Sequence, residues 1–166
     1  DEAIRIDVDS NDPLVIAQEI AAYAAAQSFD LVLCGKESID YNNGVVGAML
    51  AALLDTEYIG FATKLDIDGA TASLVREIEG GEEHVVCNLP LVVSCQKGMA
   101  EQRIPNMRGI MAARTKPLTV LAGNGAQAQS NIVSYAMPAA KTGVKMIDAD
   151  NMDQLVQLLH SEAKVI

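Results

Sequence analysis

The chain has no tryptophan, and aromatic residues make up only 4% of its 166 residues. Proteins that hold single-stranded nucleic acid usually stack the bases on aromatic side chains. The formal net charge of −10 also opposes binding to a polyanion or to an anionic membrane surface. We therefore expect no nucleic-acid partner.

Cysteine and histidine are scarce as well. The three cysteines are odd in number, which does not fit a disulfide framework and indicates a reducing compartment. There is no Cys-x-x-Cys pair, and His84 and His160 lie far apart, so we expect no metal site. Neither histidine is near Cys34 or Ser38 in the sequence. Without a base beside a nucleophile we expect no catalytic residues and no enzyme.

Two further patterns are missing. No apolar run reaches the roughly 18 residues of a membrane-spanning helix, so we expect no direct membrane insertion. The motif GxxxxGK[ST] is also absent, because the lysine of the glycine-flanked loop, Lys36, comes before the second glycine and not after it. Nucleotide triphosphate hydrolysis therefore lacks its usual machinery.

The residues that are present predict an α/β domain. Half of the chain is hydrophobic, enough for the core of one domain. Alternating apolar residues predict a strand at 3–8, and the pair Asp12-Pro13 is typical of a helix start. A short apolar strand at 30–34 and a helix at 45–54 follow. The first strand, the helix and the second strand form a unit for which we expect a right-handed crossover.

The middle of the chain changes period. Strand-like runs at 61–67, 72–78 and 83–89 are separated by Asp68-Gly69 and Gly80-Gly81, both of which are hairpin signals. The remaining expected elements are a strand at 91–95, a helix at 106–114, a strand at 118–121 and a last helix capped by Asp150 or Asn151. A mostly parallel sheet with antiparallel hairpin strands is the predicted architecture.

The loop between the second strand and the second helix is the main candidate site. A helix N-terminus offers free backbone N–H groups and the positive end of its dipole to an anion. Lys36 can neutralise a phosphate, whereas Asp40 suits a ribose hydroxyl or a helix cap. An ordinary, well-capped connection explains the spacing equally well. The candidate residues are Gly35, Lys36, Glu37, Ser38, Ile39, Asp40, Tyr41, Asn42, Asn43, Gly44, Val45 and Val46.

A basic segment at 97–116 is the second candidate. It contains five basic residues and one acid, a net charge of +4 in an acidic chain. This is consistent with a solvated loop and helix, or with a surface that binds a phosphate-bearing ligand or an acidic partner. Met99 is the apolar residue that we expect to be exposed in the loop, and a flexible, polarizable side chain favours a contact role.

Three stretches resemble the electron transfer flavoprotein β subunits. They are REIEGGEEHVVCNLPLVVS at 76–94, DLVLCGKESIDYNNGVVG at 30–47 and AEQRIPNMRGIMAARTKP at 100–117. The resemblance implies a three-layer fold of the adenine-nucleotide-binding type. It also implies a non-catalytic subunit that pairs with an α subunit and carries electrons from acyl-CoA or other flavin dehydrogenases to an acceptor. FAD is shared with the α subunit in that family.

The resemblance also assigns sites. The β subunit of the family holds AMP, or a second FAD in the electron-bifurcating type, and the nucleotide loop falls on Gly35 to Val46. Partner recognition falls on Met99, Glu101 and Arg103. The implied location is the cytoplasm in a bacterium or the mitochondrial matrix in a eukaryote.

The chain departs from the family pattern in places. Val45 and Glu37 stand where glutamine is usual, and Tyr41 to Val45 does not reproduce the Asp-Thr-Ala-Gln run of the bifurcating type, which favours AMP. We expect residues 1–147 to form the nucleotide-binding domain, lacking its N-terminal third, and 148–166 to be an arm that packs on the partner subunit. A stand-alone adenine-nucleotide-binding protein of the stress type remains an alternative.

Overall fold

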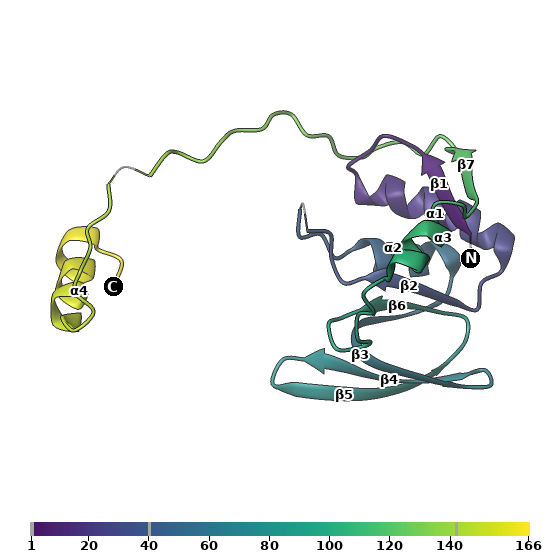
Figure 1. The fold of residues 1–166 in the computed structure, drawn as a ribbon, viewed down its shortest axis with the longest axis horizontal. Coiled ribbons are helices and arrows are strands. Elements are labelled where there is room, and N and C mark those ends of the chain that lie inside the picture. The colour runs from purple at the N-terminus through teal and green to yellow at the C-terminus, as the bar shows by residue number, and fades with distance from the viewer. Residues whose placement is uncertain (1, 40, 142) are drawn as a thin grey trace. The chain divides into compact units, whose positions relative to one another are not determined.

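The computed structural model describes residues 2–39, 41–141 and 143–166. The chain divides into two compact units, Asp1–Ile132 and Val133–Ile166. Figure 1 shows the order of the helices and strands along the chain. The α/β class with parallel strands and antiparallel hairpins is confirmed.

The first unit is built on a five-stranded sheet of order β2-β6-β3-β4-β5. Strands β2, β6 and β3 are parallel, and β4 and β5 continue the sheet as antiparallel hairpins after β3. Each of the predicted hairpin pairs contains a glycine with positive φ, Gly69 at 58° and Gly80 at 82°. The bounds are β2 Leu31–Gly35, β3 Glu57–Asp68, β4 Thr71–Ile78, β5 Gly81–Asn88 and β6 Leu91–Cys95.

Strand β6 forms the centre of the core. Its first four residues, Leu91 to Ser94, are at most 2% exposed, because β6 is paired on both edges and covered on both faces. A short, continuous apolar run is what a strand of this kind requires. This confirms the strand predicted at 91–95.

Helix α2 (Val46–Leu54) covers part of this sheet, and helix α1 (Pro13–Gln27) packs on α2. Helix α1 begins as predicted, with Asp12 as the cap and Pro13 in the first turn. Helix α2 packs against α1 and against β3 and β6. Leu50, 1% exposed, lies at the centre of this helix layer.

The first strand has a different partner from the one that its place in the chain suggests. Strand β1 (Ala3–Asp7) pairs in parallel with β7 (Leu118–Ala122) in a separate two-stranded sheet. Strands β1 and β2, which flank α1, share no ladder among the described residues. A crossover sets the direction of two strands but leaves open how many strands separate them, so the local pattern does not reveal this gap.

Strand β3 begins at Glu57, earlier than the predicted start at Phe61. Its register shifts between Ile59 and Ala62, and Phe61 takes a positive φ of 59°. The backbone N–H of Phe61 donates to the buried Ser94 hydroxyl, 3.0 Å away. This bulge breaks the alternation of side chains, which hid the first part of the strand from pattern analysis.

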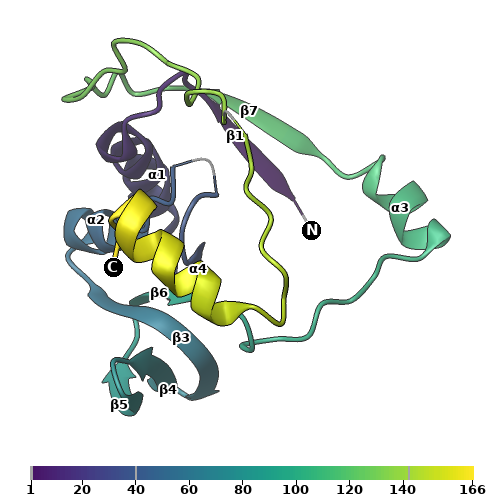
Figure 2. The same cartoon turned by 90° about the vertical axis from the view of Figure 1, so that its left-hand side faces the viewer.

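The segment between β6 and β7 extends away from the sheet. Helix α3 (Met107–Ala113) is capped by the Asn106 side chain and has no buried residue. Figure 2 shows α3 standing apart from the two helices α1 and α2. The helix predicted at 106–114 is confirmed, and its residues are available for contacts.

The second unit contains one helical element after an extended segment. Helix α4 (Met152–Leu158) is capped by Asn151, as predicted, and continues as a π-helical turn, η1 (Leu159–Ala163). The Lys145 ammonium contacts the Glu162 carboxylate at 2.8 Å, which joins the extended segment to the end of the helix.

Candidate functional site

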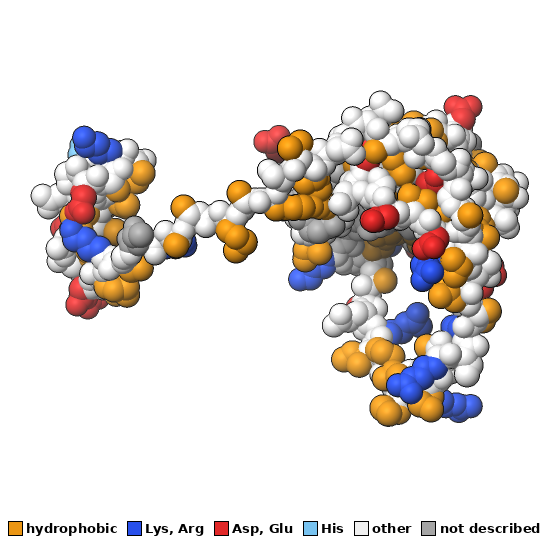
Figure 3. All heavy atoms as spheres, turned by 90° about the horizontal axis from the view of Figure 1, so that it is seen from above, with side chains coloured by type: hydrophobic (Ala, Val, Ile, Leu, Met, Phe, Trp, Pro, Cys, Tyr) orange, Lys and Arg blue, Asp and Glu red, His pale blue; other side chains and the backbone are white. Residues whose placement is uncertain are grey.

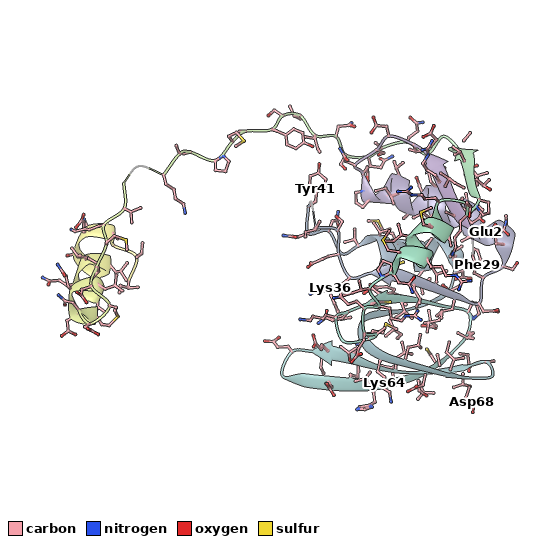
Figure 4. The ribbon with its side chains drawn as sticks, viewed as in Figure 1. Glu2, Phe29, Lys36, Tyr41, Lys64 and Asp68 are labelled. Atoms are coloured by element: carbon pink, nitrogen blue, oxygen red, sulfur yellow. The ribbon has the colours of Figure 1, made fainter. Side chains whose placement is uncertain are left out.

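The predicted loop lies at the end of β2 and leads into α2. Because β2, β6 and β3 are parallel, their carboxyl ends share one edge, the usual position of ligands in open α/β sheets. The loop folds back on itself, with the Ser38 N–H donating to the Asn43 carbonyl at 3.1 Å. Lys36 lies at the base of this loop and Tyr41 near its tip (Figure 4).

The structure brings seven of the predicted loop residues around one cavity of about 380 Å³. Its other walls come from α1, β2 and the first turns of α2, which supply Ile20, Val32, Leu33, Cys34, Gly47 and Leu50. The cavity therefore combines an apolar wall with a polar loop, the usual composition of a small-molecule site. The seven loop residues are Gly35, Lys36, Glu37, Ser38, Asn43, Gly44 and Val46.

Two glycines at the start of α2 make close backbone approaches possible. A Cβ on Gly44 would lie 3.1 Å from the Lys36 carbonyl oxygen, and one on Gly47 would lie 3.1 Å from the Tyr58 ring. The missing side chain of Gly44 lets the start of the loop lie close to the start of the helix. That of Gly47 lets α2 pack directly on β3. The first-turn N–H groups of α2, which have no acceptor inside the helix, point along its axis from this position.

Lys36 contributes a positive charge to the cavity, and its side chain lies beside an aromatic ring. Its ammonium lies 5.9 Å from the centroid of the Phe61 ring, within the range of a cation–π contact. Phe61 reaches this place through the bulge in β3. Sequence reasoning missed Phe61 and the apolar wall, since only the fold brings β3, α1 and the loop together.

The other loop residues have varied positions. Ile39 is 96% exposed, and Tyr41 and Val45 are about half exposed. Asn42 adopts a left-handed φ of 50°, which forms the turn of the loop. Asp40 lies outside the described residues. Ile39, Tyr41, Asn42 and Val45 do not line the cavity, although a bound ligand larger than the cavity would meet them.

The Cys34 thiol in the cavity wall is not an activated nucleophile. Burial, and then the neighbouring Cys95, raise the pKa of the Cys34 thiol, so this sulfur stays protonated and weakly reactive near neutral pH. The arrangement suits binding of an anionic ligand with an apolar body.

In the basic segment at 97–116, Met99 is not exposed in the way that the sequence predicts. Met99 is half-buried and packs against the core cluster around Leu74 and Val93, so it is not the exposed apolar residue of its loop. Ile104 is 87% exposed and Met107 is 72% exposed. Figure 3 shows lysine and arginine side chains interspersed with hydrophobic ones on this projecting segment. Glu101 and Arg103 are exposed beside them.

Comparison with known proteins identifies the family. The model of the electron transfer flavoprotein domain matches residues 1–124, which contain both sheets, α1, α2, α3 and the cavity. The chain belongs to the electron transfer flavoprotein domain family. The resemblance drawn from the three stretches is thus confirmed.

Curated relatives agree with this assignment. The chain is 37% identical over 180 residues to the electron transfer flavoprotein subunit beta of Bacillus subtilis (strain 168), covering all of this chain and 70% of that protein. It is 32% identical to the subunit beta of Bradyrhizobium diazoefficiens, over 93% of this chain and 63% of that protein. The human subunit beta is 31% identical over 84% of this chain and 57% of its own length.

The chain thus spans between 57% and 70% of the length of these three relatives. Within the part of the chain that the structure describes, no helix combines the length and hydropathy needed to cross a bilayer.

Proposed function

We propose that this chain works as the β subunit of a heterodimeric electron transfer flavoprotein, which carries electrons from flavin dehydrogenases to a downstream acceptor. The family match and the β-subunit relatives support the electron-transfer role. This role requires no reactive group from the subunit, which would order a cofactor environment and present docking surfaces. A reducing compartment, the bacterial cytoplasm or the mitochondrial matrix, suits its three free cysteines.

The cavity at the start of α2 is the main structural support for a bound nucleotide. It joins one cation, a helix N-terminus and an apolar wall, the groups that a phosphate and a purine require. Its volume of about 380 Å³ is near the lower end for ligand pockets, which favours AMP over a second FAD, a molecule with more than twice as many atoms. AMP held here would be structural, and the redox FAD would be shared with the α subunit.

The composition of a purified dimer tests this proposal. The chain is co-expressed with an α subunit, the complex is denatured, and the released nucleotides are identified by chromatography. AMP and FAD in equal amounts are expected. Two FAD per dimer would show that this subunit holds a second FAD in place of AMP, as in the electron-bifurcating type. A stable dimer without flavin would refute the electron-transfer role.

Two lysine variants test whether the nucleotide binds at this cavity. Lys36→Gln should weaken AMP binding to the nucleotide-free chain by roughly 10- to 100-fold, the range expected for a charge-assisted hydrogen bond. Lys64→Gln is the matched control, because Lys64 lies on β3 and pairs with Asp66 at 3.0 Å in solvent (Figure 4). Equal affinities of the two variants in calorimetric titration would place the nucleotide elsewhere.

Contact with the dehydrogenases would involve the projecting segment. We propose that Ile104 and Met107 insert into an apolar site on the partner while Arg103 and the neighbouring basic residues meet its acidic rim. Met99 would then hold the loop to the core, in keeping with its half-buried position. The C-terminal segment 148–166 would pack on the α subunit.

A further inference from the structure

Two acidic side chains, one at the cap of α1 and one inside the helix, are almost completely buried, which is unusual for carboxylates. Asp12 is 5% exposed and Glu19 is 3% exposed. Neither carboxylate forms an ion pair within the part of the chain that the structure describes. Instead, both accept hydrogen bonds from a segment more than a hundred residues later. A buried carboxylate is costly unless its oxygens are hydrogen-bonded, so these bonds are required to keep the two charges inside the fold.

The bonds to Glu19 come from the segment after β7. The backbone N–H of Asn124 donates to Glu19 Oε2 at 2.7 Å, and that of Ala126 donates to Oε1 at 3.1 Å. The side-chain amide of Asn124 adds a third bond at 3.3 Å. Both oxygens of this carboxylate are therefore occupied by one short stretch of chain.

Asp12 divides its two oxygens between two tasks. Oδ1 accepts from the Leu14 N–H at 2.9 Å and so caps α1. Oδ2 accepts from the backbone N–H groups of Gln129 and Ser130 at 2.7 and 2.9 Å. A helix cap alone needs only the first oxygen, and the second contact serves the distant segment.

The segment 124–130 depends on these bonds. It has no helix or strand assignment, so its N–H groups are not satisfied by a ladder. It leads directly to Val133, where the second unit begins. The charged residues of β1 are Arg5, which lines a cavity together with Glu19, and Asp7, which pairs with Arg5 at 3.7 Å.

We propose that Asp12 and Glu19 form a carboxylate clasp that anchors the start of the C-terminal segment to α1, and that this clasp opens without unfolding the sheet when the two carboxyls lose their charge. The clasp sets where the chain leaves the first unit. It does not depend on the proposed nucleotide or on a partner.

The sign of its pH dependence follows from the bonds. The backbone N–H of Leu14, together with those of Ser130 and Gln129, lowers the pKa of Asp12 below its ordinary value of 3.8. The N–H groups of Asn124 and Ala126 lower the pKa of Glu19 below 4.5. Carboxylates with a lowered pKa stabilise the folded form above their ordinary values, and that contribution is lost as the pH falls below them.

Amide hydrogen exchange of the full chain tests the clasp in two variants. Glu19→Gln removes the charge and turns an N–H group toward the donors, so protection of Asn124 and Ala126 should fall at least tenfold at pH 7. Asp12→Ser keeps a good helix cap but has one oxygen, so protection of Gln129 and Ser130 should fall while that of Leu14 stays. Asp7→Asn is the control and should change none of them.

The wild-type chain provides an independent measurement. Between pH 7 and pH 3 the protection factors of the four clasped amides should fall while those of Val92 and Val93 in β6 persist. Unchanged protection in both variants would overturn the clasp. Loss of the β6 amides together with the clasped ones, in the variants or in the pH series, would also overturn it, because the segment would then not open separately.

Discussion

Gly123 is the position where a single methyl group should have the largest local effect. A Cβ built there would lie 2.3 Å from Val8 Cγ2, whereas two carbons in contact are normally about 3.5 to 4.0 Å apart. Either Val8 leaves its rotamer or the chain after β7 moves by about an ångström. Overpacking of this kind costs roughly 1 to 3 kcal/mol. Movement would also lengthen the bond from Asn124 to Glu19.

A double-mutant cycle isolates this clash. Gly123→Ala should lower the free energy of unfolding by about 1 to 3 kcal/mol in urea. For a chain of this size that corresponds to a fall in Tm of about 2 to 12 °C. Val8→Ala alone should cost roughly 1 kcal/mol, since Val8 is already 39% exposed.

The combination of the two changes is decisive. Val8→Ala removes the methyl group that clashes, so adding Gly123→Ala to it should cost less than about 0.5 kcal/mol more, and the coupling should equal most of the single-variant cost. Purely additive free energies would refute the close approach of β7's end to Val8. A Gly123→Ala variant as stable as the wild type would do the same.

Two further variants test the core and the docking surface. Leu50→Ala should lower the free energy of unfolding by about 2 to 5 kcal/mol because it leaves a cavity between the helices and the sheet. The control Leu53→Ala, at a site 45% exposed, should lower it much less. Equal free energies for the two variants in urea denaturation would contradict the packing of α2. Met107→Ser should slow flavin reduction by dehydrogenases in the complex about tenfold, the effect of an interface side chain whose truncation costs more than about 1 kcal/mol, with nucleotide content unchanged. Val86→Ser, at an equally exposed site on β5, is its control, and equal rates would remove Met107 from the docking site.

Several elements could be predicted because their signals are local. Asp12-Pro13 marks the start of α1 through a cap and a ring-fixed φ, and the apolar run at 91–95 marks a strand buried on both faces. The hairpins of β4 and β5 follow from glycines that tolerate positive φ. In the loop after β2, the glycines and Lys36 were identified by residue type alone.

Other features have no local signal. The charge of Glu19 suggests a position on the solvent face of the helix. The side chain is buried instead, because its carboxylate oxygens accept hydrogen bonds from the backbone N–H groups of Asn124 and Ala126. Met99 was expected to be exposed, but β4 and β6 form a core against which it packs. Phe61 meets Lys36 only because a bulge turns its side chain to that edge.

The loop at 35–46 is recognisable in the chain because backbone conformation and helix dipoles act over a few residues. The family match extends over residues 1–124. The pairing of β1 with β7, the gap between β1 and β2, and the clasp from α1 to 124–130 depend on segments that are distant in sequence. Such contacts form only when burial of the whole core outweighs the entropy of closing long loops. The apolar wall beside the loop, with Ile20 from α1 and Leu50 from α2, also depends on segments that only the fold brings together.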